Sequence, residues 1–384
     1  MDPAKPSPDL ARALTDERVL HALMQHRRLT RAELAALIGI SKPTAGESVR
    51  RLTEAGLIAD TGERTPGGRG RGRVGSYYAL AANAGAALAV SIAPEGVVAE
   101  AVDAYGDVVG RFEREISRPA RSVQVADAVG AVAAEICEST GRTPSLAVVS
   151  AADPVDRATG RLVHLPDAPF LVGDLDPVEA LAPHVAGPVV VDNDVNWAAQ
   201  AEAVQTGAAL DDFAYLYLGE GLGCGLVNDG EVRRGASGLA GEIAHLVTIG
   251  PGSRAMTLTE VFAELGLHQP GTTAIDVDRL LAITAGPSRE ATALRDALGR
   301  AVSGVIAAVV ALTDPAAIVI GGRWGGDPGI LEAIRDGFSQ GPRHVPIRAA
   351  AVTGEAPLAG ARRYAVARLR AAIVAAAQSP STPD

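Results

Sequence analysis

The sequence predicts an α/β protein with two unlike parts, a small helical head and a larger body of strands and helices. The chain has 384 residues, more than one hydrophobic core usually serves, so two or three domains are expected. Hydrophobic residues make up 47% and charged residues 21%, which is typical of a folded globular chain. From about residue 84, short apolar runs alternate with helical patterns, which favours mixed sheets covered by helices.

Residues 16–80 predict three helices followed by a hairpin. Thr30 and Glu33 form the pattern of a capping box, and the helix that they start ends at Gly39 in a left-handed turn. Ser41 caps the next helix, which runs to Ala55 with an apolar face toward the interior. Two short helices joined by a tight glycine turn are typical of a helix-turn-helix, whose second helix enters the major groove of DNA.

The outward positions of this second helix are the candidate DNA contacts, although they also fit an ordinary solvated helix face. They are Lys42, Thr44, Glu47, Ser48, Arg50 and Arg51. Behind the helix, strands predicted at 57–59 and 77–80 flank a strip with Arg69, Arg71 and Arg73 at every second residue. Arginines on a flexible glycine strip can lie in a narrow groove, whereas a solvated linker rarely spaces them so regularly. The combination predicts a winged helix-turn-helix that binds DNA.

Charge and cysteine usage agree with this division. Residues 1–80 hold 13 Lys and Arg against 9 Asp and Glu, whereas the rest of the chain holds 22 against 36, so the head alone is suited to a polyanion. Cys137 and Cys224 lie far apart, which argues against a disulfide framework and favours a reducing compartment. Residues 1–10 lack a signal-peptide pattern, and the apolar run 302–312 is about half the length of a membrane span. We therefore expect a cytoplasmic protein without a membrane partner.

Three stretches of the body carry a more specific pattern. Residues 189–196 place Asn193 and Asp194 after a strand, where open α/β sheets bind ligands. Residues 219–225 are rich in glycine and predict a turn between strands, and residues 241–245 follow with Glu242 and His245. Residues 314–322 form a buried strand that ends in paired glycines. In order and spacing these stretches resemble the ROK family (repressors, open reading frames and kinases) over residues 84–375. The resemblance implies a two-lobed, actin-like and sugar-kinase-like (ribonuclease H-like) domain.

The resemblance also implies a set of effector-binding residues. In the family an Asn-Asp pair binds sugar hydroxyls, and Asn193 and Asp194 match it; Glu242 and His245 match a Glu-x-Gly-His motif in which Ala244 replaces the glycine. Each of these residues alone is more commonly structural or solvated. The full set of predicted sugar contacts is Asp167, Asn193, Asp194, Glu242, His245 and Glu260.

The kinase and zinc motifs of the family are degenerate. Where kinases have a phosphate loop, this chain has residues 91–95, in which Pro94 lacks an amide hydrogen and Glu95 adds a negative charge. Glu220 stands where the second glycine turn usually has Thr, and two such acids would repel a phosphate. The zinc-binding cysteines are absent from residues 249–260, and His245 alone cannot hold the metal. We expect no catalytic residues, no cofactor and no metal.

The sequence thus predicts a non-enzymatic, DNA-binding transcriptional regulator, specifically a repressor. The predicted domains are a head at 1–80 with a disordered N-terminal tail and a body at 84–375, followed by a disordered tail at 376–384. The body divides into a first lobe at 84–192, completed by the C-terminal helix, and a second lobe at 193–357. The expected partners are a palindromic double-stranded operator, a sugar or sugar-derivative effector and further copies of the chain in a homodimer or homotetramer. Two alternatives stay open: a body that serves only dimerisation or protein contact, and a divergent sugar kinase with a DNA-binding head.

Overall fold

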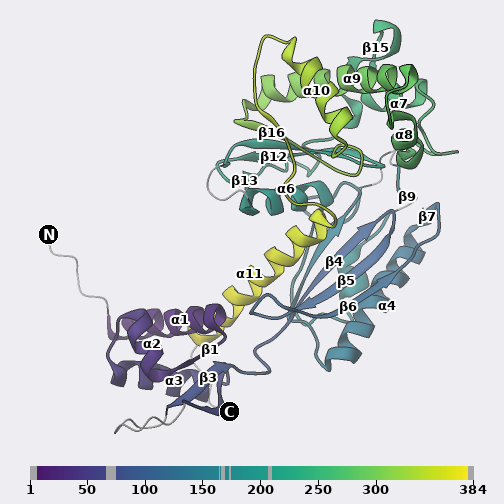
Figure 1. Cartoon of the computed structure of the whole chain (residues 1–384). Coiled ribbons are helices and arrows are strands. Elements are labelled where there is room, and N and C mark those ends of the chain that lie inside the picture. The colour runs from purple at the N-terminus through teal and green to yellow at the C-terminus, as the bar shows by residue number, and fades with distance from the viewer. Residues whose placement is uncertain are drawn as a thin grey trace.

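The computed structural model describes residues 7–65, 75–163, 165, 169–172, 174–205 and 210–378, which fold into a head and two lobes. Figure 1 shows the head set apart at one end of the molecule, with one long C-terminal helix running from the region between the lobes down to it. The α/β organisation that the sequence predicted is confirmed.

The head is a winged helix-turn-helix. Its elements are α1 (Pro8–His26), β1 (Arg28–Thr30), α2 (Arg31–Ile38), α3 (Lys42–Glu54), β2 (Ile58–Arg64) and β3 (Ser76–Leu80). The predicted caps are present: Thr30 and Glu33 form a reciprocal capping box, Gly39 has φ +69°, and the Ser41 hydroxyl accepts from the Thr44 amide. The strands form one antiparallel sheet in the order β1-β3-β2. Local capping chemistry therefore determines where each helix starts and stops.

One prediction about α3 is wrong: Ser48 does not face outward. Ser48 is fully buried and its hydroxyl donates to the carboxylate of Asp16 of α1, a residue that is itself only 6% exposed. Arg51 completes the set, since its guanidinium donates to the two Asp16 oxygens at 2.6 and 3.0 Å. A buried carboxylate requires donors, and these two residues of α3 supply them.

The first lobe is built on a five-stranded sheet of order β10-β8-β4-β5-β6. Its strands are β4 (Ala87–Ala93), β5 (Gly96–Val102), β6 (Val108–Arg114), β8 (Leu146–Ala151) and β10 (Val189–Asn193). The strands β4, β8 and β10 run parallel, and β5 and β6 add an antiparallel hairpin extension. Helix α4 (Ser122–Thr140) covers one face (Figure 1), with α5 (Pro177–Leu181) and the short pair β7 (Ala120–Arg121) and β9 (Leu171–Val172) nearby.

The second lobe repeats the plan with the order β13-β12-β11-β16-β17. Its strands are β11 (Phe213–Leu218), β12 (Leu222–Asn228), β13 (Glu231–Val232), β16 (Ala317–Gly321) and β17 (Ile347–Ala349), and a separate hairpin pairs β14 (Val247–Ile249) with β15 (Ala255–Thr257). The helices are α6 (Asp194–Gln205), α7 (Leu258–Glu264), α8 (Val277–Thr284), α9 (Arg289–Thr313) and α10 (Pro328–Ser339), with short 3-10 turns η2 (Ile243–His245) and η3 (Pro251–Ser253).

The sequence suggested that residues 219–225, with their glycines, form a turn, and this prediction is only partly right. Only 219–221 form the turn, and β12 begins at Leu222. Gly223 and Gly225 lie in the strand against α6, where an added Cβ would come within 2.7 Å of Val195 and 2.8 Å of Ala199. These two glycines therefore serve the close packing of a helix on a sheet.

Helix α9 is longer than the apolar run that the sequence displayed. Within the described residues it is the one helix long and apolar enough to cross a membrane by length and composition, and half of its most apolar window is buried inside the structure. Its apolar residues, among them Leu298, Val302 and Ile306, belong to the core of the second lobe, where α9 packs against α10 and α8. A buried core helix accounts for its composition.

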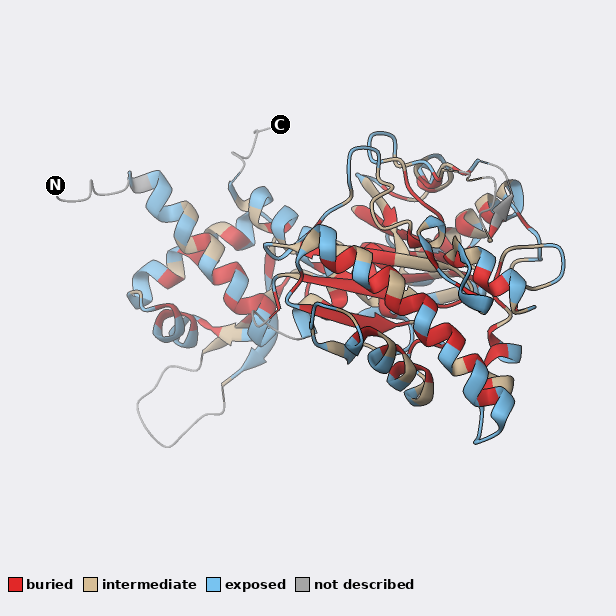
Figure 2. Ribbon diagram, turned by 90° about the horizontal axis from the view of Figure 1, so that it is seen from above, coloured by how far each residue is buried: buried red, intermediate tan, exposed pale blue. Residues whose placement is uncertain are grey.

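Helix α11 (Ala356–Gln378) connects all three parts. It continues past residue 375, where the sequence prediction ended the folded body. Along its length it contacts α6, then β4 and β8 of the first lobe, and finally α1 of the head. Its residues Ala361, Leu369 and Ile373 share one apolar cluster with Leu20 and Leu23 of α1. Figure 2 shows buried residues, in red, in the elements of both the head and the body, and the shared cluster means that the head is packed against the body and is not attached only by a linker.

Polar contacts reinforce this joint at the turn between β5 and β6. The Arg27 guanidinium forms a two-pronged pair with Asp107 at 2.6 and 2.7 Å and lies 5.3 Å from the centre of the Tyr105 ring. The Tyr105 hydroxyl accepts from the Leu80 amide at 3.1 Å and donates to the Arg27 carbonyl at 3.3 Å. Arg370 of α11 donates to the carbonyls of Ala104 and Tyr105. The end of α1 and strand β3 of the head and helix α11 of the body thus all contact this one turn.

We expect Leu369→Ala to lower the free energy of unfolding by about 2–5 kcal/mol, because it removes a side chain that is 1% exposed from the shared cluster. The head and the body should unfold together in the wild type, and urea denaturation followed by circular dichroism and tryptophan fluorescence checks both points. The exposed neighbour Arg368→Ala is the matched control and should change little. Separate transitions for head and body in the wild type would contradict the shared core.

Candidate functional site

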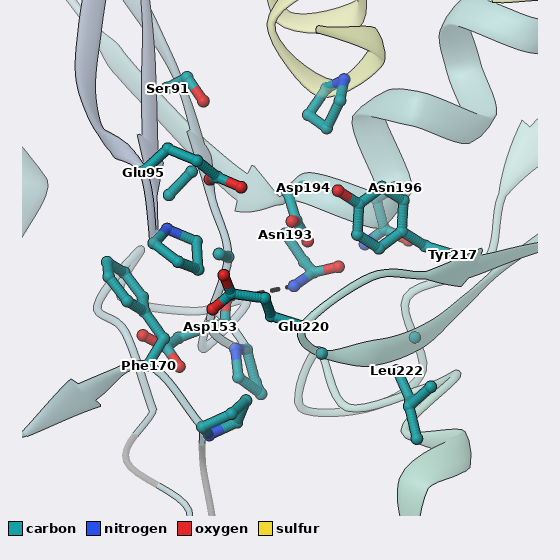
Figure 3. Close-up of a pocket in the computed structure, with 18 of the residues that line it drawn as sticks. Ser91, Glu95, Asp153, Phe170, Asn193, Asp194, Asn196, Tyr217, Glu220 and Leu222 are labelled. Atoms are coloured by element: carbon teal, nitrogen blue, oxygen red, sulfur yellow. Dashed lines mark hydrogen bonds between the residues drawn. The ribbon is translucent and has the colours of Figure 1, made fainter. Parts of the chain in front are cut away.

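A cleft of about 740 Å³ opens between the two lobes (Figure 3). It is lined by the ends of β4 and β5 from the first lobe, by the start of α6, by the β11–β12 turn and by the start of α11. The predicted effector residues Asn193, Asp194, Glu242 and His245 all line it. The fold therefore brings together four side chains that the sequence placed in two separate stretches.

Asn193 and Asp194 are held by the beginning of helix α6. The Asn193 Oδ1 accepts from the Val195 amide at 3.0 Å, and its Nδ2 donates to the carbonyls of Asp153 and Ala151 at 3.2 and 3.4 Å. Asp194 accepts from the same Val195 amide through Oδ1 at 2.8 Å. These bonds satisfy an amide that the first turn of a helix leaves without a partner. They also orient Asp194 at the wall of the cleft, where Figure 3 shows it beside Asn193.

The charge of Asp194 is disfavoured at this position. Burial is the largest cause, and the nearby carboxylates of Asp153, Glu242 and Glu95 add to it, so the pKa of Asp194 is raised to about 7. The Val195 amide opposes the shift only in part. A carboxyl group with this pKa exists in both protonation states near neutral pH, so it can either donate or accept a hydrogen bond there.

Two of the predicted effector residues are not brought to this site. Glu260 is exposed, does not line the cleft, and its carboxylate accepts from the amide and hydroxyl of Thr257 in a second capping box at the start of α7. These bonds lower the pKa of Glu260. Contact of Glu260 with a ligand stays a prediction, without support from this geometry. Asp167 lies outside the described residues.

The residues present do not fit the zinc site of the family. Residues 249–260 span the end of β14, the turn and strand β15 of the β14–β15 hairpin and the start of α7, all without a thiolate, and His245 lies in the turn η2 that precedes the hairpin. Among the described residues, no group of three or more His, Cys, Asp or Glu side chains is placed to hold a metal ion. The hairpin is held by other means, since the buried Thr248 hydroxyl donates to the Ala301 carbonyl of α9 at 2.6 Å.

Sequence reasoning missed two side chains that shape the cleft, Tyr217 and Phe170. Tyr217 is on β11, and burial together with the neighbouring Asp194 raises the pKa of its phenol. The alternation of sides along 213–218 could have placed Tyr217 on the face opposite Leu216 and Leu218, although not in the cleft. Phe170 follows a stretch outside the described residues and gave no pattern to recognise.

An arginine offsets the charge of one of the two acids at the degenerate phosphate loops. Glu95 and Glu220 both line the cleft, as predicted, but Arg118 donates to the two Glu220 oxygens at 2.7 and 3.0 Å. Nothing in the local sequence around Arg118 indicated this pairing, because the two residues are 102 positions apart. The expected repulsion at this end of the cleft is therefore reduced by an internal cation.

The candidate DNA-binding surface of the head is exposed on α3. Lys42 and Thr44 are exposed at its first turn, and Glu47 and Arg50 are about half exposed and paired with each other at 2.6 Å. Arg51 is turned toward Asp16, as described above. The wing residues Arg69, Arg71 and Arg73 lie outside the described residues.

Comparison with known proteins identifies both parts of the chain. A family model described as the ROK family matches residues 88–367, and a model described as winged helix-turn-helix DNA-binding matches residues 12–59. The chain belongs to the ROK family. Its organisation, a ROK domain behind a DNA-binding head, is consistent with a transcriptional regulator.

Similar proteins include both regulators and enzymes. A ROK family transcriptional regulator, a homologue of the E. coli MLC protein, matches with a TM-score of 0.63 at 19% identity and covers 96% of this chain and 99% of its own. A putative xylose repressor from Caldicellulosiruptor sp. is 22% identical over 59% of this chain and 57% of its own length. The bifunctional enzyme NanE/NanK of Brucella melitensis is 32% identical over 40% of this chain, and the match spans only 30% of that enzyme.

The raised pKa of Asp194 predicts a pH dependence of stability. Between about pH 4 and 7 the folded chain retains a proton on Asp194 that the unfolded chain releases, so the free energy of unfolding falls as pH rises through this window. Asp194→Asn removes the group that titrates. The difference in the free energy of unfolding between this variant and the wild type should therefore shift by about 2 kcal/mol in favour of the variant from pH 4 to pH 8, a value reduced for solvent in the cleft.

Urea titrations of both proteins across this pH range measure the difference. Asp174→Asn, a change at an exposed position outside the cleft lining, is the control and should keep the wild-type profile. A difference between Asp194→Asn and the wild type that does not vary with pH would show that Asp194 titrates normally.

Proposed function

We propose that this ROK-family chain is a transcriptional repressor that responds to a sugar without phosphorylating it. One observation carries the proposal: the helix that begins at the cleft ends in the core of the DNA-binding head. Leu358, near the start of α11, lines the cleft, and Leu369 and Ile373 pack in the cluster that includes α1. An occupant of the cleft is thus one helix away from the head.

A second contact links the cleft to the same helix. Asp194 is the first residue of α6, and α6 packs along α11. Gly360 makes this packing close, since an added Cβ would lie 2.0 Å from the Trp197 carbonyl of α6. A ligand that binds Asp194 better in one lobe arrangement than in the other would change the position of α11 and with it the position of the head. Such coupling requires that the ligand bind the two arrangements of the lobes with different affinity. A cleft between two lobes is a site where this difference can arise.

The charge of the cleft favours an uncharged or cationic sugar over a sugar phosphate. Basic groups in the lining are Arg114 and His245, whereas the acidic groups are Glu95, Glu113, Glu115, Asp153, Asp194, Glu220, Glu242 and Glu355. Arg118 and Arg111, outside the lining, pair with Glu220 and Glu355, so the other acids make the excess of negative charge. A phosphate ester in such surroundings would be repelled. We propose that Asn193, Asp194, Glu242 and His245 contact the hydroxyl or amino groups of the sugar, with Asp167 as a further candidate.

The same acidic surroundings argue against phosphoryl transfer, which depends on neutralising the phosphates. We therefore propose a non-enzymatic role in the cytoplasm, with two or four copies of the chain presenting paired heads to a palindromic operator. The two rival functions are a sugar kinase that carries a DNA-binding head and a body that serves only assembly. Because some similar proteins are enzymes, the sugar kinase remains a rival function.

The DNA-binding part predicts a specific effect of Lys42. Lys42→Ala should weaken binding to the operator, recovered by selection from random DNA, by about 1–3 kcal/mol and relax preference at one base position in each half-site, if the lysine reads a base edge. A fluorescence-anisotropy titration against the operator and its single-base variants measures both. Arg279→Ala, an exposed position on α8 of the second lobe, is the control for loss of one positive charge.

The wing gives a contrasting pattern. Replacing Arg69, Arg71 and Arg73 by Ala should lower affinity on all sequences and reduce the salt dependence by about one unit for each lost phosphate contact. Wild-type affinity in both the Lys42 variant and the wing variant would remove the head from the DNA interface.

The sugar-responsive part predicts a super-repressor. A thermal-shift screen of neutral sugars, amino sugars and sugar phosphates identifies the effector, and Asp194→Asn should weaken its binding about ten- to a hundredfold. The titration is made at pH 8, where Asp194 is mostly charged. Operator binding without sugar should be unchanged, so Asp194→Asn should stay on DNA at sugar concentrations that release the wild type.

The same proteins separate the rivals. Sugar-dependent consumption of ATP by the wild type would overturn the non-enzymatic proposal. A wild type that shows neither a thermal shift nor release from the operator with any sugar would favour a body used only for assembly. Asp174→Asn serves again as the control and should release from DNA as the wild type does.

A further inference from the structure

Arg118 lies in the first lobe, after β6, and its side chain crosses to the second. Its Nη1 donates to Glu220 Oε2 at 2.7 Å and to Gln269 Oε1 at 3.2 Å, and its Nη2 donates to Glu220 Oε1 at 3.0 Å. The same Nη2 also donates to the carbonyl of Pro94 at 3.2 Å. One guanidinium therefore joins the β4–β5 turn of the first lobe to the β11–β12 turn of the second.

The partner carboxylate is held firmly by its own turn. The Glu220 side chain is 18% exposed, and Figure 3 shows it extending from the β11–β12 turn across the cleft. The backbone of this turn is bonded on two sides, since the Ile275 amide donates to the Glu220 carbonyl at 2.9 Å and the Trp324 indole donates to the Gly219 carbonyl at 2.9 Å. A carboxylate fixed in this way presents both oxygens to the planar fork of an arginine.

The surrounding charge makes Arg118 the group on which this contact depends. Hydrogen bonding to Glu220 is the largest cause that raises the pKa of Arg118, and the negative charge of Glu95 acts in the same direction. Glu95 lies in the turn whose Pro94 carbonyl accepts from Arg118. Without the guanidinium, one acid from each lobe would line the same end of the cleft without the cation on which the charges of both now act.

We propose that Arg118 is a positioning residue that clamps the two lobes together across the mouth of the cleft in the free protein. The clamp joins the β4–β5 turn at residues 94–95 to the β11–β12 turn at residues 219–221. The chain thereby keeps the two lobes in this arrangement with its own side chain as the bridge. The inference concerns the protein without ligand or DNA and does not depend on the proposed function.

Hydrogen exchange of the full-length protein tests the clamp. Arg118→Gln and Glu220→Gln should each raise amide exchange about three- to tenfold in both loops, because opening one end of the bridge releases both turns. The decisive readout is transfer between lobes: Glu220→Gln must raise exchange at the amides of Glu95 and Gly96, and Arg118→Gln must raise it at residues 219–221. The double variant should show no more exchange than either single one, since the two changes break the same contact.

Arg233→Gln is the matched control. Arg233 pairs with Asp229 at 3.1 Å within the second lobe, so its loss should leave both loops unchanged. Circular dichroism melts confirm that each variant is folded. If a variant unfolds, raising the salt concentration of the wild type gives the same test. The Arg118 side of the pair is about half exposed, so salt screens the pair in part and exchange should rise in the same two turns.

Three results would overturn the clamp. Exchange changes confined to the lobe that carries the substitution would show that Arg118 and Glu220 act locally. Effects that multiply in the double variant would show that the two residues act independently. Exchange in the two loops that is insensitive to both substitutions and to salt would show that other contacts hold the lobes.

Discussion

The close packing of α11 on α6 is the contact on which the rest of this molecule depends. Gly360 allows it, since any side chain there would meet the backbone of Trp197. Trp197 is in turn fixed by donation of its indole to the Val149 carbonyl at 2.9 Å and by ring contact with Tyr364 at 5.1 Å. A helix that lies this close to the start of the second lobe can also cover the sheet of the first lobe and reach the head.

A network of charged side chains around a buried glutamate also holds α11 in this position. Glu100 of β5 is 2% exposed and accepts from Arg111 of β6 at 2.7 Å and from Arg362 of α11 at 2.9 Å. Arg111 also pairs with Glu355, which precedes α11 and lines the cleft. Removing any one residue of this network would leave an uncompensated charge, so the network favours a single position of α11 against the first lobe. The cleft, the first lobe and the head are thus joined by both apolar and polar contacts.

Much of the fold could be predicted because its signals are local. The capping box of Thr30 and Glu33 and the glycine at 39 depend on bonds within one or two turns, and the structure confirms them. The strand that leads to Asn193 and Asp194 was equally visible, because its three consecutive valines are typical of a parallel strand. Ser48 was misplaced because its polarity suggested a solvated face, whereas the buried Asp16 on another helix required its hydroxyl.

By itself the sequence determined the helices and turn of the head, the α/β class of the body, the division into head and body and the position of the Asn-Asp pair at the end of a strand. These features follow from hydrophobic period, caps and turn residues, all of which act over short distances along the chain. Only the tertiary structure decided which side chains meet: Glu260 with its own helix instead of the cleft, Arg118 with an acid of the other lobe, and α11 with the core of the head. Such meetings depend on how whole elements pack, and no spacing within a single segment encodes them.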